Sequence, residues 1–477
     1  MLPAVAANED TPPQLIGEFK PMDDWQVHLN ALFYGLRGGR AGDSYPTMAS
    51  ADYRLAHALA ADYYDHAVRR DRATSSLAPR TSSLVIHEWG CGNGNLAACF
   101  LSHLKQLDAA GDLYRKTRYV LVDEQRETLQ AALAHPDLAP HRERVATLQA
   151  DVQDLAAVKD GSLHWILCNE LWSELRTKIL LRKEGEIIEE RLQPNLSDAK
   201  YKEFDDWSAF VRAFATRDVA ALRNGPSFLD EIIWEKDYQP IDWKRVPYRK
   251  TITDFMKPMD DLVIVPANFG AFATIKEARR LLASGGGFTS LDAGTPDMDV
   301  LTDPDKPCYG LHGGQYTFIV NFALCETVAK QLGVKEVTVE RQREFVSRML
   351  GVNLLTVMDL LETYPSPRQL KPWEQDRLTL KTLKVLDGRY RSPYSRTLDY
   401  PIRTGAPELE RAELETLLKG LPATGVPDTI AYLSEEEVLG AVTDLEALGF
   451  ERARIQALLE AGVRREIEYY RFSFTSP

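Results

Sequence analysis

A glycine-rich turn is the first feature of the sequence that could bind a ligand. Gly90, Gly92 and Gly94 follow an apolar segment at residues 83–88 and precede a helical pattern at residues 96–107. A ligand that lies directly on a backbone turn needs glycine there, because glycine has no Cβ atom and accepts left-handed backbone angles. In a doubly wound sheet, the turn after the first strand is where nucleotide-like cofactors bind. We therefore expect these three glycines to contact a cofactor.

Polar residues at the ends of four predicted strands indicate the chemistry of that cofactor. Asp123 can accept hydrogen bonds from ribose hydroxyls, and Asp151 can accept one from an adenine amino group. Glu88 suits a cationic or amine group, while Asn169 and Glu170 face the reactive end. An acid-lined site suits a ligand that carries an amine and a sulfonium rather than a pyrophosphate. The third glycine also lies one residue earlier than in the dinucleotide fingerprint, which disfavours a nicotinamide oxidoreductase.

The elements that must position these residues alternate between strand and helix patterns. This alternation predicts an α/β fold with a doubly wound, mostly parallel Rossmann-like sheet. The predicted strands are residues 83–88, 119–123, 145–150, 163–168, 262–265, 288–292 and the region 331–339. The predicted helices are residues 52–70, 96–107, 126–134, 272–282 and 341–350.

The 477 residues exceed one ordinary domain, so we expect additions to a catalytic domain. Residues 1–46 are predicted to be irregular, and residues 47–352 to form the catalytic domain. An aromatic, charged stretch at residues 201–248 interrupts the alternation and is interpreted as a helical insertion that forms a lid. Residues 353–477 are predicted to be a mostly helical extension, with a helical pair at residues 434–461 that packs on its own domain or docks a partner.

The composition of the chain indicates which partners and which cellular compartment to expect. A net charge of −13 argues against a chain that coats nucleic acid or an anionic membrane, so neither is expected as a partner. The five scattered cysteines suit a reducing compartment and are interpreted as small buried apolar residues. No ligand spacing indicates a metal site, and no apolar run could span a bilayer. The N-terminus carries no signal-peptide pattern, so a cytoplasmic protein is expected.

At these motifs the sequence resembles class I S-adenosylmethionine-dependent methyltransferases, and more closely the MidA-like family. That family includes the mitochondrial complex I assembly methyltransferase, which modifies a protein arginine. The resemblance runs from about Gly42 to Val352. It is carried by residues 42–47 with Ser50, 87–96, 169–176, 292–294, 309–312 and 320–322.

The resemblance implies S-adenosylmethionine as the cofactor and a protein or peptide side chain, such as an arginine guanidinium, as the acceptor. The catalytic candidates are Glu170, Glu174, Asp292 and His312. On a helix, Glu170 and Glu174 would share one face and could pair with a guanidinium. Asp292 would end a strand near the substrate entrance, and His312 could act as a base or orient the acceptor.

The sequence departs from the family on the acceptor side. Ser173, Arg176 and Ala293 replace the family's Asp, Pro and Tyr, so the fold and cofactor are implied more strongly than the substrate. Two alternatives therefore stay open. One is methylation of a small molecule or of another protein side chain. The other is a non-catalytic binding or assembly factor with a cofactor-shaped cleft. A functioning cofactor site is favoured by four intact residues: Glu88, Gly90, Asp123 and Glu170.

Overall fold

The computed structural model describes most of the chain. The described residues are 13–37, 47, 49, 52–73, 83–244, 246–312, 314–390, 392, 400, 402, 405–421, 430–462 and 465–477. Residues 42–46, which contribute to the resemblance, lie outside these ranges. Within the ranges, no helix has both the length and the apolar character needed to cross a membrane.

The chain divides into two compact units, each built from separate segments. The sheet unit comprises Tyr45–Glu170, Glu277–Asp292 and Lys335–Pro477. The insertion unit comprises Met1–Ser44, Leu171–Lys276 and Ala293–Val334. The inserted segment at 171–276 is therefore longer than the predicted one at residues 201–248.

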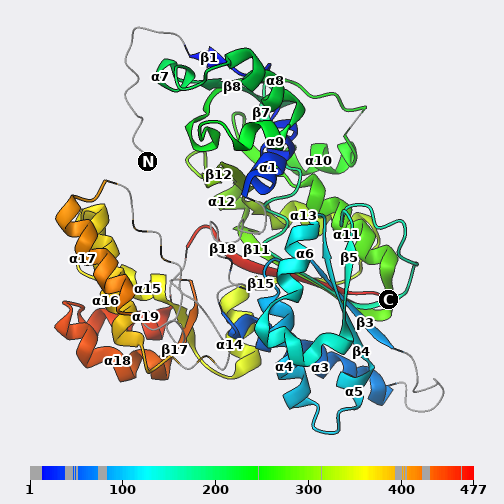
Figure 1. The fold of residues 1–477 in the computed structure, drawn as a ribbon. Helices are drawn as coiled ribbons and strands as arrows, with labels where there is room; N and C mark the ends of the chain where they lie inside the picture. The colour runs from blue at the N-terminus through cyan, green and yellow to red at the C-terminus, as the bar shows by residue number, and fades with distance from the viewer. Residues whose placement is uncertain are drawn as a thin grey trace. The chain divides into compact units, whose positions relative to one another are not determined.

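A central sheet organises the sheet unit, with the strand order β15-β18-β11-β6-β3-β4-β5 (Figure 1). Its strands are β3 (Leu84–Trp89), β4 (Thr117–Asp123), β5 (Val145–Gln149), β6 (Leu163–Asn169), β11 (Leu282–Thr295), β15 (Val337–Arg341) and β18 (Glu468–Thr475). Strands β11, β6, β3, β4 and β5 run parallel, whereas β18 is antiparallel to β15. The predicted fold class, an α/β protein with a mostly parallel doubly wound sheet, is confirmed.

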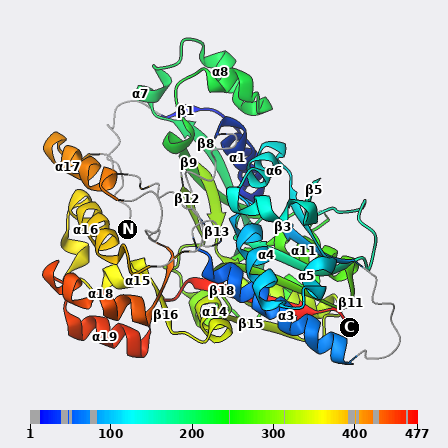
Figure 2. The same ribbon diagram turned by 60° about the horizontal axis from the view of Figure 1, so that its bottom comes forward.

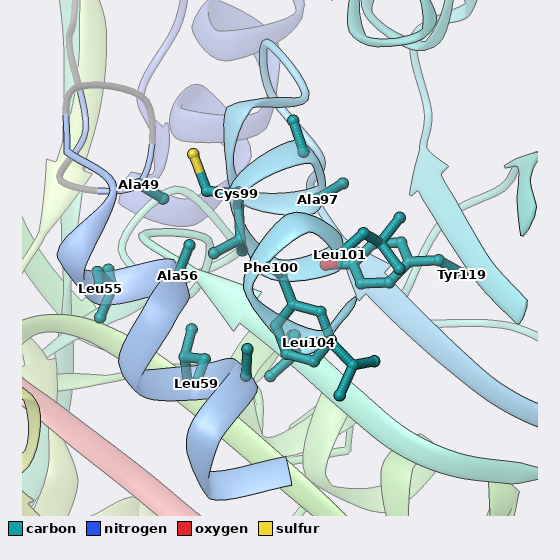
Figure 3. Close-up of a cluster of buried hydrophobic side chains, with 14 of the residues drawn as sticks. Ala49, Leu55, Ala56, Leu59, Ala97, Cys99, Phe100, Leu101, Leu104 and Tyr119 are labelled. Atoms are coloured by element: carbon teal, nitrogen blue, oxygen red, sulfur yellow. The ribbon is translucent and has the colours of Figure 1, made fainter. Parts of the chain in front are cut away.

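Helices of the predicted periodicity flank these strands. They are α3 (Arg54–Ala73), α4 (Asn95–Leu107), α5 (Asp112–Lys116), α6 (Arg126–Leu133), the 3-10 helix η2 (Pro136–Arg144), α11 (Phe269–Leu281) and α14 (Gln342–Leu350). Figure 3 shows Leu55 and Leu59 of α3 beside Phe100 and Leu104 of α4, with Tyr119 of β4 next to them; all five side chains are buried. This cluster fixes α3 and α4 on one face of the sheet.

The insertion unit contains a second, antiparallel sheet that the sequence did not reveal. Strand β8 (Glu186–Leu196) pairs with β7 (Lys178–Lys183) and β9 (Ile233–Pro240), and β7 pairs with β10 (Ile264–Ala267). The prediction that 262–265 resumes the parallel sheet is therefore wrong. The short strands β1 (Gln14–Leu15) and β2 (Lys20–Pro21) also pair with β8. The remaining strands are β12 (Tyr309–His312), β13 (Gln315–Phe318) and β14 (Val320–Asn321).

Two further sequence predictions for this unit need correction. Within the supposedly irregular residues 1–46, α1 (Met22–Arg37) is a regular helix with Trp25 and Phe33 buried. The 201–248 segment is only partly helical, because it also supplies strand β9. Its helices are α8 (Trp207–Thr216) and α9 (Val219–Arg223), preceded by α7 (Asp198–Tyr201) and followed by the 3-10 helix η3 (Leu229–Glu231). The unit is completed by α10 (Arg249–Met256), α12 (Met298–Thr302) and α13 (Phe322–Gln331).

The aromatic residues that suggested a lid form the core of the insertion unit. Phe214 stacks on Trp25 of α1 with ring centroids 5.8 Å apart, and Phe210 packs on Phe228 at 5.1 Å. All four side chains are buried. Their burial is thus accounted for by packing within their own unit.

The region after residue 353 is mostly helical within the described residues. Its helices are α15 (Val357–Glu362), the 3-10 helix η4 (Pro367–Gln369), α16 (Pro372–Leu386), α17 (Glu408–Lys419), α18 (Glu435–Ala447) and α19 (Arg452–Ala461). Figure 2 shows α15, α16, α18 and α19 gathered in one bundle, and β16 (Leu354–Thr356) pairs with β17 (Tyr432–Ser434) beside it.

This helical bundle binds to α3 through buried polar contacts. Arg54 forms a 2.7 Å ion pair with Glu437, and the Tyr390 hydroxyl donates to Asp52 at 3.0 Å. The bundle therefore has a packing partner within its own chain. The chain then returns to the central sheet as β18, so residues 353–477 do not form a separate appendage.

The burial of β18 predicts a large stability effect in the last part of the chain. Phe472 is fully buried in this strand, so Phe472→Ala should lower the free energy of unfolding by about 3–5 kcal/mol. Thr475→Ala, at an exposed position of the same strand, should change it by less than about 0.5 kcal/mol. Denaturant titration of both variants checks this. Equal, small effects would show that β18 does not contribute to the core.

Candidate functional site

The strand order places a topological switch point between β3 and β6. From β3 the chain proceeds to β4 and β5 on one side, and then to β6 and β11 on the other. In open α/β sheets, ligands bind at the carboxyl ends of the strands where the order reverses in this way. The glycine turn follows β3, and Asn169 ends β6 with Glu170 directly after it.

The three glycines adopt left-handed backbone angles and have different tasks. Their φ values are 73° at Gly90, 50° at Gly92 and 81° at Gly94. A Cβ atom on Gly94 would lie 2.6 Å from the carbonyl oxygen of Ala132 in α6, so this glycine allows α4 and α6 to pack closely. A Cβ atom on Gly92 would meet no atom of the described residues within 4 Å. Gly92 therefore borders open space, where a ligand can approach the backbone.

Strand register places three of the predicted cofactor residues on one face of the sheet. Glu88 pairs with Leu121 of β4 and with Leu167 of β6. Asp123 and Asn169 lie two residues beyond those partners, and side chains two residues apart on a strand share a face. Glu88, Asp123 and Asn169 thus project from the same face at the carboxyl edge of adjacent strands.

Burial destabilises the negative charge of two of these carboxylates. Burial raises the pKa of Glu88 to about 8, and the nearby Asp123 adds to the shift. The Tyr119 hydroxyl, which donates to Glu88 at 2.8 Å, opposes it. Burial also raises the pKa of Asp123 to about 6, although the backbone N–H of Gln125 donates to its Oδ1 at 2.8 Å. A cationic ligand at this edge would stabilise both charged forms.

Asn169 and Glu170 form a polar pair at the end of β6. The Asn169 Nδ2 donates to Glu170 Oε1 at 3.3 Å, while the buried Asn169 Oδ1 has no hydrogen-bond partner in the described part of the chain. The other carboxylate oxygen of Glu170 accepts a 3.2 Å hydrogen bond from the Tyr469 hydroxyl of β18. Sequence reasoning missed Tyr469, because 299 residues separate it from its partner and no local pattern connects them.

Asp151 lies two residues beyond β5 and is exposed. Its Oδ1 accepts hydrogen bonds from the backbone N–H of Gln153 at 2.8 Å and from the side-chain amide of Gln153 at 3.3 Å. The neighbouring Glu124 has a raised pKa, caused first by burial and then by the charges of Asp151 and Asp123. Asp151 therefore extends the acidic edge to β5.

Two of the catalytic candidates, Asp292 and His312, have surroundings that the sequence did not predict. Asp292 does not end a strand, because β11 continues to Thr295. Its neighbour Leu291 pairs with Asn169, so the buried Asp292 side chain projects from the opposite face. His312 is the last residue of β12 in the insertion unit, and its side chain lies outside the described part.

The prediction that Glu170 and Glu174 share a helical face is wrong. Glu170 has a left-handed φ of 48°, and the residues that follow form turns rather than a helix. The Glu174 N–H donates to the Leu171 carbonyl at 3.1 Å, and its carboxylate accepts from the Tyr34 hydroxyl of α1. Glu174 thus belongs to a hydrogen-bonded turn of the insertion unit.

Two residues that depart from the family motif, Arg176 and Ser173, contact other parts of the insertion unit. Arg176 forms ion pairs of 2.7 Å with Asp23 and 2.9 Å with Asp24, both from α1. The Ser173 carbonyl accepts a 2.9 Å hydrogen bond from the Phe318 N–H. Within the described residues, no group of three or more His, Cys, Asp or Glu side chains is arranged to hold a metal ion.

Comparisons with known proteins give fold-level likenesses only. No protein-family model and no curated protein matches the sequence. A structure of a Burkholderia thailandensis protein, named as a candidate methyl transferase and bound to S-adenosylhomocysteine, has 12% identity and a TM-score of 0.47, over 96% of this chain and 88% of that one. A second structure of an uncharacterized protein from that organism has 12% identity and a TM-score of 0.43, over 96% and 94% of the two chains.

A third similar structure is phosphoethanolamine N-methyltransferase 2 from Haemonchus contortus, bound to phosphomonomethylethanolamine and S-adenosylhomocysteine. It has 10% identity and a TM-score of 0.30, over 87% of this chain and 52% of that one. Likenesses at this level carry no argument about the activity. The fold assignment rests on the strand order and register described above.

The raised pKa of Glu88 predicts a pH dependence of stability. Its pKa is 4.5 in the absence of burial and about 8 in the folded protein, so the folded state holds a proton that the unfolded chain releases between these values. The free energy of unfolding should therefore fall as the pH rises from 5 to 8. In Glu88→Gln the fall should be smaller, leaving the variant more stable than the parent at pH 8.

Urea denaturation at pH 5 and at pH 8 measures this difference. Glu143→Gln, at an exposed glutamate of the same unit, is the matched control and should keep the slope of the parent. If Glu88→Gln also keeps that slope, the proton on Glu88 does not contribute to stability.

Proposed function

We propose that this protein is an S-adenosylmethionine-dependent methyltransferase. The observation that carries the proposal is the set Glu88, Asp123 and Asn169, which projects from one face of the sheet beside the turn at Gly92. A carboxylate-rich edge with open space at a glycine suits a ligand with ribose hydroxyls and an amine, and it disfavours a pyrophosphate.

The residues present fit this cofactor. The buried Asn169 Oδ1 has no partner among the described residues and is an acceptor suited to a ligand amine. Asp123 would accept hydrogen bonds from two ribose hydroxyls, and the exposed Asp151 would accept one from the adenine amino group. Glu88 lies beneath the turn with a raised pKa, and the cationic end of the ligand would lower that pKa and favour its charged form. When bound, the cofactor supplies a methyl group on a sulfonium sulfur.

We further propose that the acceptor is a cationic nitrogen of a protein or peptide, with an arginine guanidinium as the favoured group. The support is Glu170, a buried carboxylate beside Asn169 that both neutral neighbours orient by hydrogen bonds. A carboxylate can bind a guanidinium through paired charge-assisted hydrogen bonds, which align the nitrogen for an in-line displacement. Asp292, Glu174 and His312 stay candidates for the acceptor side.

Cytoplasmic location is part of the proposal. It is supported by the five cysteines, which all lie within the described residues: none forms a disulfide, and four are buried. Free buried thiols suit a compartment in which disulfides do not form.

Cofactor binding should depend on Gly92 and Asp123. Gly92→Val places a branched side chain in the open space and in a left-handed conformation, so it should abolish measurable binding of S-adenosylmethionine. Asp123→Ala removes a charged acceptor and should weaken binding by about 1–3 kcal/mol, which is roughly 5- to 150-fold. Calorimetric titration with S-adenosylmethionine, and with NAD in parallel, measures both effects.

Asp112→Ala is the matched control, because Asp112 is an exposed acid of α5 at the amino end of β4. It should bind S-adenosylmethionine as the parent does. Tighter binding of NAD than of S-adenosylmethionine would overturn the proposed cofactor. Unchanged binding in both site variants would overturn the proposed site.

The acceptor class is tested with S-adenosylmethionine labelled in the methyl group. Synthetic peptides that contain arginine should accept label, and peptides with lysine or glutamine in place of arginine should accept at least 10-fold less. Glu170→Gln should lower transfer by roughly 100-fold while S-adenosylmethionine binding is retained. Label transferred only to small amines or to carboxyl groups would contradict a guanidinium acceptor. Tight cofactor binding without transfer to any probe would favour a non-catalytic binding factor.

A further inference from the structure

Hydrogen bonds from its own backbone and to its side chain hold Glu170 in an unusual backbone conformation. Its φ of 48° lies in the left-handed region, which residues other than glycine rarely adopt. The Glu170 N–H donates to the Leu291 carbonyl of β11 at 2.7 Å, which fixes the backbone. Its two carboxylate oxygens accept from Asn169 Nδ2 at 3.3 Å and from the Tyr469 hydroxyl at 3.2 Å. Backbone strain of this kind persists where the surrounding structure over-determines it, and it is often found at functional sites.

We propose that Tyr469 is a positioning residue for Glu170. This inference rests on the proposed function, in which Glu170 binds the acceptor. The phenol approaches the carboxylate oxygen that Asn169 does not contact, so the two donors together fix the plane of the carboxylate. Both donors are neutral, so neither of them forms an ion pair with Glu170.

Strand β18 is rigid enough for this task. Arg471, two residues beyond Tyr469, pairs with Glu340 at 2.8 Å and with Asp62 of α3 at 2.6 Å. The Arg471 guanidinium also lies 4.3 Å from the centre of the Phe345 ring of α14. Since side chains two residues apart on a strand share a face, Tyr469 projects from the same face as this anchored arginine. A functional group on a packed strand is held more closely than one on a loop.

The orientation of the Glu170 carboxylate can be tested without knowing the natural acceptor, by comparing two cofactor analogues. Sinefungin carries an amine-bearing carbon where S-adenosylmethionine carries its methyl-bearing sulfur, whereas S-adenosylhomocysteine has no group there. An oriented Glu170 carboxylate should therefore bind sinefungin more tightly than S-adenosylhomocysteine. The ratio of the two dissociation constants compares a ligand that carries a cationic amine at the reacting centre with one that carries none. The change of this ratio in Glu170→Gln gives the part that depends on the Glu170 carboxylate.

The experiment measures both ligands by calorimetry on the full chain and on three variants. Tyr469→Phe should reduce the preference for sinefungin by about 3- to 10-fold with little change in S-adenosylhomocysteine binding. Glu170→Gln should abolish the preference. Tyr470→Phe, on the next residue of β18 and the opposite face, is the matched control and should keep the parent's ratio. Thermal unfolding verifies that each variant is folded.

The outcomes separate this inference from the proposed function. If neither ligand binds the parent, the proposed function fails. If both bind the parent equally, Glu170 does not face the reacting end, and its proposed role fails together with that of Tyr469. If Glu170→Gln abolishes the preference and Tyr469→Phe leaves it unchanged, only the inference about Tyr469 is wrong. A purely structural tyrosine would weaken both ligands together and leave their ratio constant.

Discussion

Parallel register at the carboxyl edge of the central sheet is the constraint on which the site depends. Because β3, β4 and β6 run in the same direction, their last residues meet at one edge, and Glu88, Asp123 and Asn169 share a face. Side-chain alternation makes this arrangement sensitive to register, since a shift of one residue would turn all three side chains to the other face. The buried cluster of α3, α4 and β4 in Figure 3 supports that register, because Phe100 of α4 packs on Tyr119, which projects from the same face of β4 as Asp123.

The parts of the fold with strong periodicity could be predicted from the sequence. Strands β3 to β6 and the helices between them carry their own patterns, so their order along the chain and the residues at their ends follow directly. Strand β18 and the end of β11 were not predicted in this way. The elements of the insertion unit lack such patterns. Helix α1 places Gln26 and Asn30 on its buried side, where they hydrogen-bond backbone carbonyls such as that of Glu174. Strand β9 lies at the edge of its sheet, where charged residues are tolerated and the apolar alternation disappears.

In the candidate site, too, some features are determined by neighbouring residues in the sequence and others by contacts between distant segments. The left-handed turn at Gly92 and the carboxylate of Asp123 are encoded within a few residues of a strand end, so sequence spacing finds them. The surroundings of Glu170 depend on Leu291 and Tyr469, which join it only after the whole sheet has assembled. The wrong assignment of Glu170 and Glu174 to one helix has this origin, because spacing alone cannot reveal the left-handed backbone at Glu170.

The position of β18 explains how Tyr469 can hold its hydrogen bond to Glu170, although the two residues lie far apart in the sequence. This strand lies between β11 and β15, so its backbone hydrogen bonds and the burial of Phe472 fix it within the sheet unit. The bundle of α15 to α19 precedes it and binds α3 through Arg54 and Glu437, so the chain reaches β18 from an anchored body. The backbone of Glu170 is strained, so its side chain needs donors that are themselves fixed. A donor on a loosely packed segment would have to be ordered first, and the entropy cost of ordering it would oppose the hydrogen bond. The same sheet that presents the predicted cofactor residues thereby also orients the carboxylate proposed to meet the acceptor.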